Sequence, residues 1–166
     1  MTRRFALAAL ASPLLAQSGG VTLILVRHGD RDQGSDPDEP LNALGQARAA
    51  ELARVLVDSG VTQVFVTQLK RTGQTAAPLV AKTKAKLRVL PAEDLPALDR
   101  ELRALPAGSV ALVVSHGGRL EPLLEGFGHK VKAIAREEYD RMYWMTLVEG
   151  KSVGLTQVRY GAHRAL

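Results

Sequence analysis

The chain has 166 residues, enough for one domain with its own hydrophobic core and too few for two. With 46% hydrophobic and 23% charged residues, its composition is that of an ordinary globular protein and excludes a disordered chain. The formal net charge of +5 suits small anionic ligands, no basic patch interleaved with aromatic residues points to nucleic acid, and the lack of cysteine excludes disulfides and a cysteine nucleophile.

Residues 1–18 have the pattern of a secretory signal. The basic start MTRR precedes an apolar stretch, FALAALASPLLA, and small residues stand at Ala16 and Ser18. That stretch is too short to span a bilayer. We therefore predict a signal peptide over residues 1–18 and one domain over residues 19–166, in an exported protein of the periplasm or extracellular space without a membrane span. The alternative is a first helix or an irregular start of the fold in a cytoplasmic protein.

VTLILV, residues 21–26, is a continuous apolar run of strand length. Such a run is expected in a strand inside a sheet that is covered on both faces. LNALGQARAAELARVLVDSG, residues 41–60, follows a polar connection and carries apolar residues at helical spacing. These residues are Leu41, Leu44, Ala49, Leu52, Val55 and Leu56. We predict a helix there, with Gly60 placed to stop it.

Two further strands flank a second helix. TQVFVT (62–67) has the pattern of another buried strand, and LRVL (87–90) that of a short one. Between them, RTGQTAAPLVAKTKA (71–85) predicts a helix that bends or ends near Pro78, because proline lacks the N–H that a helix interior uses.

The second half of the chain continues this alternation and then changes. EDLPALDRELRALPAG (93–108) predicts a helix, SVALVVS (109–115) a buried strand, and GRLEPLLEGFG (118–128) a short helix. The segments 142–148 and 152–160, on either side of EGK, have the pattern of an antiparallel hairpin.

Strands that alternate with helices through short connections predict an α/β fold. We expect a three-layer sandwich in which helices flank a mostly parallel central sheet. In such sheets the ligand lies beyond the carboxyl ends of the strands. The first strand ends in Arg27 and His28. Arg71 follows the second strand and His116 the last buried one, so two arginines and two histidines should meet at one edge.

This combination of side chains predicts a phosphate site. Arginine offers a planar fork that fits two phosphate oxygens, and it keeps its charge. A neutral imidazole can attack phosphorus and form a phosphohistidine that water then hydrolyses. We also expect backbone N–H groups at Gly29, Gly117 and Gly118 to approach the anion.

The histidines differ in their surroundings. Neither a carboxylate nor a third histidine stands at ligand spacing from His28 and His116, so we expect no metal ion and no other cofactor. His129 and His163 carry no motif, and we interpret them as structural residues.

Four segments together resemble a known family. LVRHGD, LNALGQARA, VTQLKRTGQTA and VVSHGG are similar to four blocks of the histidine phosphatase superfamily, also called phosphoglycerate-mutase-like, and stand in that family's order between about residues 21 and 118. The resemblance implies a phosphoglycerate-mutase-like sheet sandwiched by helices. It also implies that His28 is the phosphorylated nucleophile, with Arg27, Arg71 and His116 completing the phosphate pocket.

The sequence departs from the family pattern at several positions. Thr67–Leu69 stands where the family usually has Ser-Pro-Leu, Thr72 where alanine follows the arginine, and Asn42 where threonine follows leucine. We expect these changes to affect loop shape and the start of a helix, and to leave the four charged groups untouched. Arg31 matches an additional pocket arginine of the acid-phosphatase branch, but Gly117 replaces that branch's aspartate, so we interpret Arg31 as a loop cation.

Cleavage of a phosphomonoester leaves an alkoxide unless a general acid protonates it. In the mutase-like branch a glutamate does so, and Glu93 lies in the corresponding loop region. Asp94 is explained as a helix cap, Asp30 is a second candidate, and Glu93 is otherwise an exposed acid in the first turn of a helix.

These observations predict a phosphatase that hydrolyses phosphomonoesters through a phosphohistidine intermediate and acts on small or envelope substrates. One alternative is a phosphohistidine protein phosphatase, because cleavage from nitrogen demands less of an acid. Another is a phosphate-binding module of the same fold without turnover. A mutase is disfavoured because the short connection after residues 87–90 leaves no room for the insertions of true phosphoglycerate mutases. The oligomeric state is left open.

Overall fold

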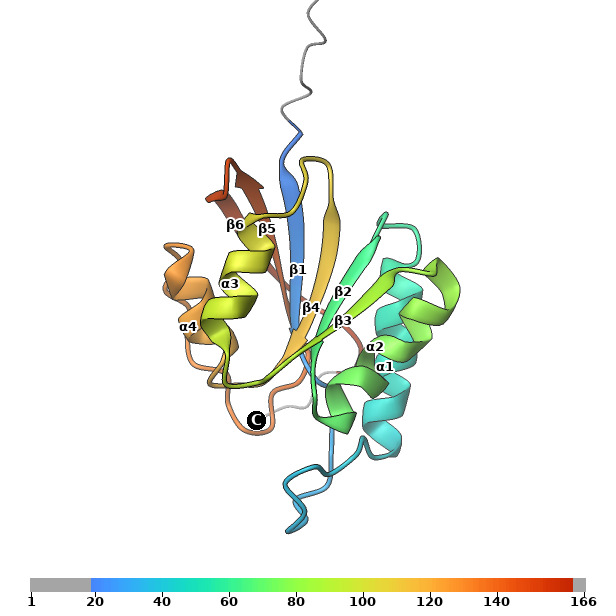
Figure 1. The fold of residues 1–166 in the computed structure, drawn as a ribbon. Coiled ribbons are helices and arrows are strands. Elements are labelled where there is room, and N and C mark those ends of the chain that lie inside the picture. Colours follow the sequence, from blue (N-terminus) through green and yellow to red (C-terminus); the bar gives the residue numbers. More distant parts are fainter. Residues whose placement is uncertain (1–18, 163–166) are drawn as a thin grey trace, which may run out of the picture.

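A central β-sheet organises the molecule in the computed structural model, which describes residues 19–162 (Figure 1). Its strands are β1 (Val21–Arg27), β2 (Gln63–Thr67), β3 (Lys86–Leu90), β4 (Val110–Ser115), β5 (Arg141–Val148) and β6 (Lys151–Arg159). They lie in the order β3-β2-β4-β1-β5-β6. The first four strands are parallel, and β5 and β6 add the predicted antiparallel hairpin. The predicted signal segment, residues 1–18, and His163 lie outside the described residues.

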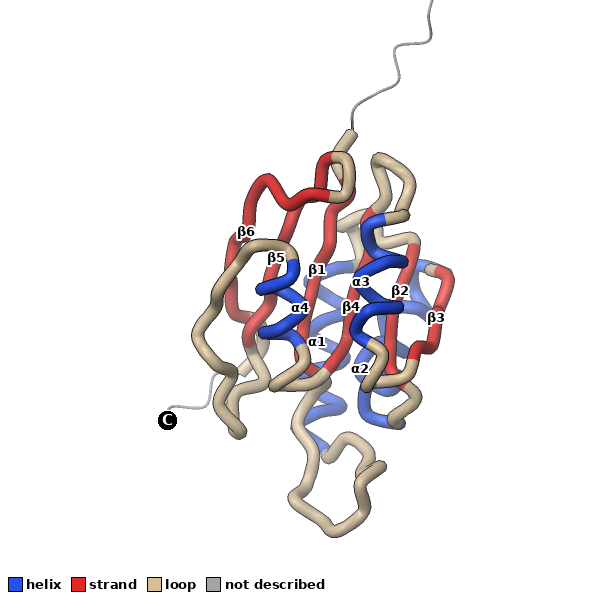
Figure 2. Tube along the Cα trace, turned by 60° about the vertical axis from the view of Figure 1, so that its left-hand side comes forward, coloured by secondary structure: helices blue, strands red, loops and turns tan. Residues whose placement is uncertain are grey.

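Helices cover both faces of this sheet. They are α1 (Ala43–Leu56), α2 (Lys70–Thr83), α3 (Leu95–Arg103) and α4 (Leu120–Gly126). Figure 2 shows α3 and α4 in front of the sheet and α1 and α2 behind it. The predicted three-layer α/β sandwich is therefore confirmed. Among the described residues, no helix combines the length and apolar character that crossing a membrane requires.

The side chains of β1 alternate between the two halves of the core. Leu23 and Leu25 belong to the cluster that also contains the buried leucines of α3 and α4, whereas Ile24 and Val26 belong to the cluster under α1 and α2. All four side chains are fully buried. A strand covered on both faces has no polar side, which explains the continuous apolar run in the sequence.

The buried face of α1 differs from the predicted one. Leu44 and Val55 are 51% and 41% exposed, and Gly45 and Arg48 lie on the buried face instead. The reason is the close approach of α1 to the loop after β1. A side chain at position 45 would place its Cβ 2.1 Å from the Asp30 carbonyl oxygen, so only glycine fits there.

Helix α2 does not end at Pro78, and that part of the prediction was wrong. The helix runs from Lys70 to Thr83 with Pro78 inside it. Ala76 and Leu79, on either side of the proline, are fully buried in the core shared with α1. Their burial outweighs the single backbone hydrogen bond that the proline removes.

Candidate active site

The register of the sheet brings the two predicted site histidines together. β1 and β4 are parallel neighbours that pair Arg27 with Ser115, so the residue after each strand emerges at the same edge. The backbone N–H of His28 donates to the Ser115 carbonyl at 2.9 Å. The ring centroids of His28 and His116 are 5.2 Å apart.

Both arginines of the predicted pocket are held by backbone carbonyls. Arg71 lies in the first turn of α2, and its Nη1 donates to the Pro37 carbonyl at 2.9 Å. Arg27 Nη1 donates, at 2.9 to 3.1 Å, to the carbonyls of Ala135, Arg136 and Glu138. The Nε atoms of Arg27 and Arg71 are buried and have no partner within the described chain. Buried donors are normally paired, so these two N–H groups are placed to receive an anion.

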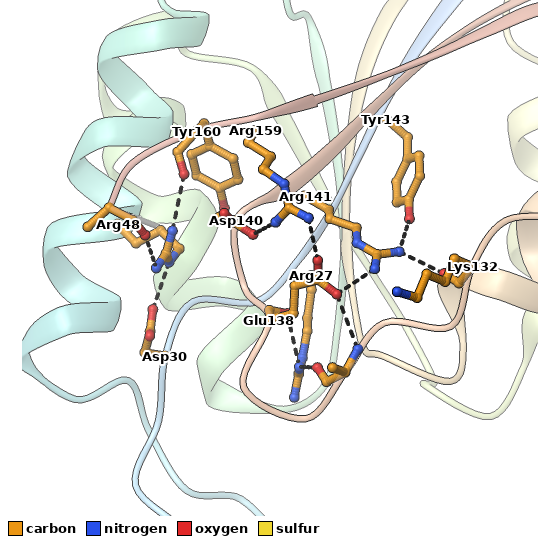
Figure 3. A network of polar contacts seen from close by, with 12 residues as sticks. Arg27, Asp30, Arg48, Lys132, Glu138, Asp140, Arg141, Tyr143, Arg159 and Tyr160 are labelled. Carbon is orange, nitrogen blue, oxygen red and sulfur yellow. Dashed lines mark hydrogen bonds and ion pairs between the residues drawn. The ribbon is translucent and has the colours of Figure 1, made fainter. Parts of the chain in front are cut away.

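Glu138 braces the loop that holds Arg27 (Figure 3). Its buried carboxylate lies 2.6 Å from Arg141 Nη2 and 2.7 Å from Arg159 Nη2. It also accepts the backbone N–H of Ala135, one of the residues whose carbonyl receives Arg27. Burial raises the pKa of Glu138, but the hydrogen bonds from Arg141 and Arg159 outweigh it and lower this pKa to about 2. The carboxylate is therefore ionised and keeps the loop in place.

His28 is oriented as a neutral nucleophile would be. Its Nδ1 lies 2.8 Å from the Gly29 carbonyl, and because a carbonyl only accepts, Nδ1 carries the proton and Nε2 the lone pair. Burial lowers the pKa of His28 to about 2, with help from the charge of Arg27, while the bond to Gly29 opposes the shift. Only 3% of the residue is exposed. Nε2 has no hydrogen-bond partner among the described residues, so its lone pair is available.

His116 is also held neutral. Burial lowers its pKa to about 4, and the charges of Arg71 and Arg27 add to the effect. Its Nε2 lies 3.0 Å from Thr67 Oγ1. The expectation that the departure at position 67 would leave the charged groups untouched was therefore wrong. β2 lies beside β4, so its last residue reaches the histidine that follows β4.

Comparison with known proteins agrees with this geometry. Residues 23–99 match the family model described as the histidine phosphatase superfamily, branch 1. This stretch, just under half of the chain, is therefore similar to the histidine phosphatase superfamily. No match was found among the curated proteins.

Several solved structures share this fold. The protein histidine phosphatase SixA, solved with tungstate, is 21% identical, with a TM-score of 0.71, over 83% of this chain and 96% of its own. A mycobacterial glucosyl-3-phosphoglycerate phosphatase is 16% identical, with a TM-score of 0.64, over 87% of this chain and 100% of its own. A protein from Nakamurella multipartita described as a phosphohistidine phosphatase SixA is 20% identical, with a TM-score of 0.63, over 89% of this chain and 98% of its own.

Two backbone N–H groups of the candidate site do not face an anion as predicted. The N–H of Gly29 donates to Thr75 Oγ1 at 2.9 Å. The N–H of Gly118 donates to Glu121 at 2.7 Å. In both cases the acceptor is a side chain of a helix, and the sequence alone does not give its position. The N–H groups of these two glycines are therefore already hydrogen-bonded within the protein.

The three acids considered as proton donors lie in different environments. Asp30 is buried and forms an ion pair of 2.7 Å with Arg48, which ties the loop after β1 to α1. Asp94 caps α3, as predicted, by accepting the N–H of Ala97 at 3.0 Å. Glu93 is exposed, and its carboxylate lies 3.5 Å from the Gln68 amide nitrogen at the edge where β2 ends.

A polar groove of about 580 Å³ adjoins the site. Arg31 and Arg136 line it together with Asn42 and Tyr139. The charge of Arg31 contributes, after burial, to lowering the pKa of Arg71. Arg31, which we interpreted as a loop cation, is thus part of the positive environment of the site.

His129 lies away from the site and has a local partner. Its Nε2 lies 2.6 Å from Ser152 Oγ, which fits the structural role assigned to it. Within residues 19–162, no group of three or more histidine, aspartate or glutamate side chains is arranged to hold a metal ion.

Sequence reasoning missed Tyr139 and Glu138. Both lie just before β5, a strand antiparallel to β1 that pairs Met142 with Val26. An antiparallel strand begins at the edge where its parallel neighbours end, so the residues before it reach the site. The polar run EEYDR directly before the predicted hairpin is the sequence signal that could have identified them.

Proposed function

We propose that this protein is a phosphatase that cleaves phosphomonoesters by transferring the phosphoryl group to His28 Nε2. The observation that carries the proposal is the pair of neutral imidazoles 5.2 Å apart, with two arginines whose buried Nε–H groups lack partners within the described chain. A neutral imidazole is the nucleophilic form, and the arginines supply the charge that a phosphoryl group needs.

Two steps account for the chemistry. First, the Nε2 lone pair of His28 forms an N–P bond as the P–O ester bond breaks, and the departing oxygen takes a proton from Glu93 or from water. Then water attacks phosphorus and returns a proton to Glu93 or to solvent, the N–P bond breaks, inorganic phosphate leaves and Nε2 regains its lone pair. Arg27 and Arg71 stabilise the charge on the equatorial oxygens in both steps.

Hydrolysis of p-nitrophenyl phosphate tests the proposal. Purified protein should release phosphate without added metal, and His28→Ala should reduce the rate to background because no other group provides the nucleophile. The matched control is His129→Gln, which alters a histidine bonded to Ser152 and should retain wild-type activity. Turnover that survives His28→Ala contradicts the mechanism. Phosphate binding without hydrolysis of any ester would indicate a binding module.

A second function, phosphohistidine protein phosphatase, is favoured by one observation. The three candidate acids, Asp30, Asp94 and Glu93, are respectively paired, capping a helix and exposed. A phosphoramidate demands less protonation of its leaving nitrogen than an ester does of its oxygen. Glu93→Gln distinguishes the two functions. If Glu93 serves as the acid, the variant hydrolyses glycerol phosphate about 100-fold more slowly but p-nitrophenyl phosphate nearly unchanged. An enzyme specialised for phosphohistidine should hydrolyse a phosphohistidine peptide best, and Glu93→Gln should not change that rate.

We also propose that the protein is exported and acts on small or envelope phosphomonoesters. The pattern of residues 1–18 supports the export, because a basic start, an apolar stretch and small residues stand in the order of a signal peptide. Mass spectrometry of the protein from its native host should find a new N-terminus near Gln17 to Gly19. An intact first residue would contradict export by this signal.

A further inference from the structure

Tyr139 lies against the two residues at the end of β1. Its ring centroid is 5.7 Å from that of His28, and the Arg27 guanidinium carbon lies 4.0 Å above the ring. The residue is 4% exposed and forms part of the wall of the polar groove. Contact with both a cation and an imidazole fixes the orientation of the ring.

The hydroxyl of Tyr139 has no hydrogen-bond partner within the described chain, although it is buried. A buried hydroxyl is normally paired, and leaving one unsatisfied costs about 1–3 kcal/mol. Arg27 Nε and Arg71 Nε are buried without partners in the same region. Burial lowers the pKa of both arginines, and Tyr139 is among the groups that oppose this effect on each.

Three unsatisfied donors belong to Arg27, Arg71 and Tyr139, and a single acceptor beside the site histidines would satisfy all of them if it contacted each donor. An oxyanion with tetrahedral oxygens provides it, because separate oxygens can accept from separate donors. Nearby carboxylates within the described chain are already bonded elsewhere: Asp30 to Arg48, Glu138 to Arg141 and Arg159, and Glu121 to the backbone N–H groups of Gly118 and Ile134.

We propose that Tyr139 is a catalytic residue whose hydroxyl donates a hydrogen bond to the phosphoryl group, on the side that faces the polar groove. The catalytic part of this inference rests on the proposed function. Its binding part rests on the three unpartnered donors. The hydroxyl is the third donor beside Arg27 and Arg71. The two arginines supply positive charge, and the phenol adds a directional hydrogen bond. It adds no proton transfer and requires no further reactant.

Binding of orthovanadate, measured by calorimetry, tests the binding part without turnover. Tyr139→Phe removes only the oxygen and keeps the ring beneath Arg27. We expect its dissociation constant for orthovanadate to rise about 10- to 100-fold, the effect of losing a hydrogen bond to a charged group. The kcat/KM for p-nitrophenyl phosphate should fall by a similar factor.

Tyr160→Phe is the matched control. The Tyr160 hydroxyl is also buried without a partner among the described residues, but its ring lies in the core cluster under α1 and α2. The control should bind orthovanadate as the wild type does, and both variants should keep the wild-type melting temperature or exceed it.

Each outcome decides the inference. Orthovanadate affinity within twofold of the wild type in Tyr139→Phe overturns it, as does an equal loss in Tyr160→Phe or a wild type that binds no orthovanadate. If affinity depends on the Tyr139 hydroxyl but the wild type hydrolyses no substrate, the binding site stands and the proposed function fails.

Discussion

The two site histidines stay neutral because nearly everything around them disfavours a positive charge. Both are largely removed from solvent, and Arg27 and Arg71 place guanidinium charges beside each of them. In the proposed mechanism the neutral form of His28 is the reactive one, so the arginines that would bind a phosphoryl group would also add to the effect of burial in keeping His28 unprotonated. The charges of Arg27 and Arg71 would therefore serve both the binding of the phosphoryl group and the neutral state of His28.

This shift predicts that stability falls in mildly acidic solution. Between about pH 6.5 and about pH 5 the unfolded chain protonates His28 and His116, whereas the folded protein, with pKa values of about 2 and about 4, does not. The contribution of the two neutral histidines to the free energy of unfolding is therefore complete above about pH 6.5. It decreases as the pH falls, by up to about 1.4 kcal/mol per pH unit for each histidine.

Urea unfolding in phosphate-free buffer measures this slope. We expect His28→Ala to depend on pH less steeply than the wild type, because one of the two groups is removed. Equal slopes for the two proteins would show that His28 is protonated as readily in the folded protein as in the unfolded chain.

At the scale of elements, the site depends on a loop that no strand or helix contains. β5 runs antiparallel to β1, so the residues before it arrive beside Arg27. Their carbonyls accept hydrogen bonds from the Arg27 guanidinium. Glu138 fixes this loop through its ion pairs with Arg141 and Arg159 (Figure 3). Glu138 is a positioning residue, because it acts on the phosphate site only through Arg27.

We expect Glu138→Gln to weaken both the fold and the site. Loss of the carboxylate leaves the buried Arg141 without a charged partner, which costs about 3 kcal/mol in the free energy of unfolding. The kcat/KM for p-nitrophenyl phosphate should fall about 10-fold as Arg27 loses its fixed position. The control is Glu101→Gln, which breaks the more exposed ion pair with Arg88 and should change stability by less than about 1 kcal/mol. Full activity in a folded Glu138→Gln protein would contradict the positioning role.

The junction of β1 and α1 makes a second prediction, from two glycines in helices. A Cβ at Gly45 would lie 2.1 Å from the Asp30 carbonyl oxygen, whereas one at Gly73 in α2 would meet nothing within 4 Å. We expect Gly45→Ala to destabilise the protein by about 3 kcal/mol or more, because a backbone must move. Gly73→Ala should instead stabilise it by about 0.5–1 kcal/mol. Urea unfolding of both variants measures this, and equal effects would exclude a close contact at Gly45.

For the whole molecule, the sequence predicted the features that periodicity and strand ends determine. The order of strands and helices and the meeting of His28 with His116 both came from apolar runs that stop at polar residues. The features that escaped prediction depend on contacts between distant segments. Leu44 is exposed because Gly45 must face Asp30, and α2 passes Pro78 because both flanks are buried. Local patterns do not record such contacts.

The distribution of charge over the two ends of the sheet leads to the last prediction. Arg119 is exposed at the start of α4, and its charge contributes to lowering the pKa of His116, after burial and the larger effects of Arg71 and Arg27. Lys86 begins β3, at the end of the parallel strands opposite the site. A charge at the site's end should attract a dianionic substrate, while one at the far end should not.

Arg119→Gln should therefore lower kcat/KM for p-nitrophenyl phosphate about 3- to 10-fold at low ionic strength, and Lys86→Gln should leave it unchanged. Because salt screens exposed charges over about 10 Å at about 0.1 M, the difference between Arg119→Gln and the wild type should shrink when NaCl reaches about 0.5 M. Steady-state rates of both variants and the wild type, measured from low ionic strength up to this NaCl concentration, test the prediction. A deficit that persists at high salt means that Arg119 contacts the substrate directly, since a direct, desolvated contact is screened much less than a long-range field.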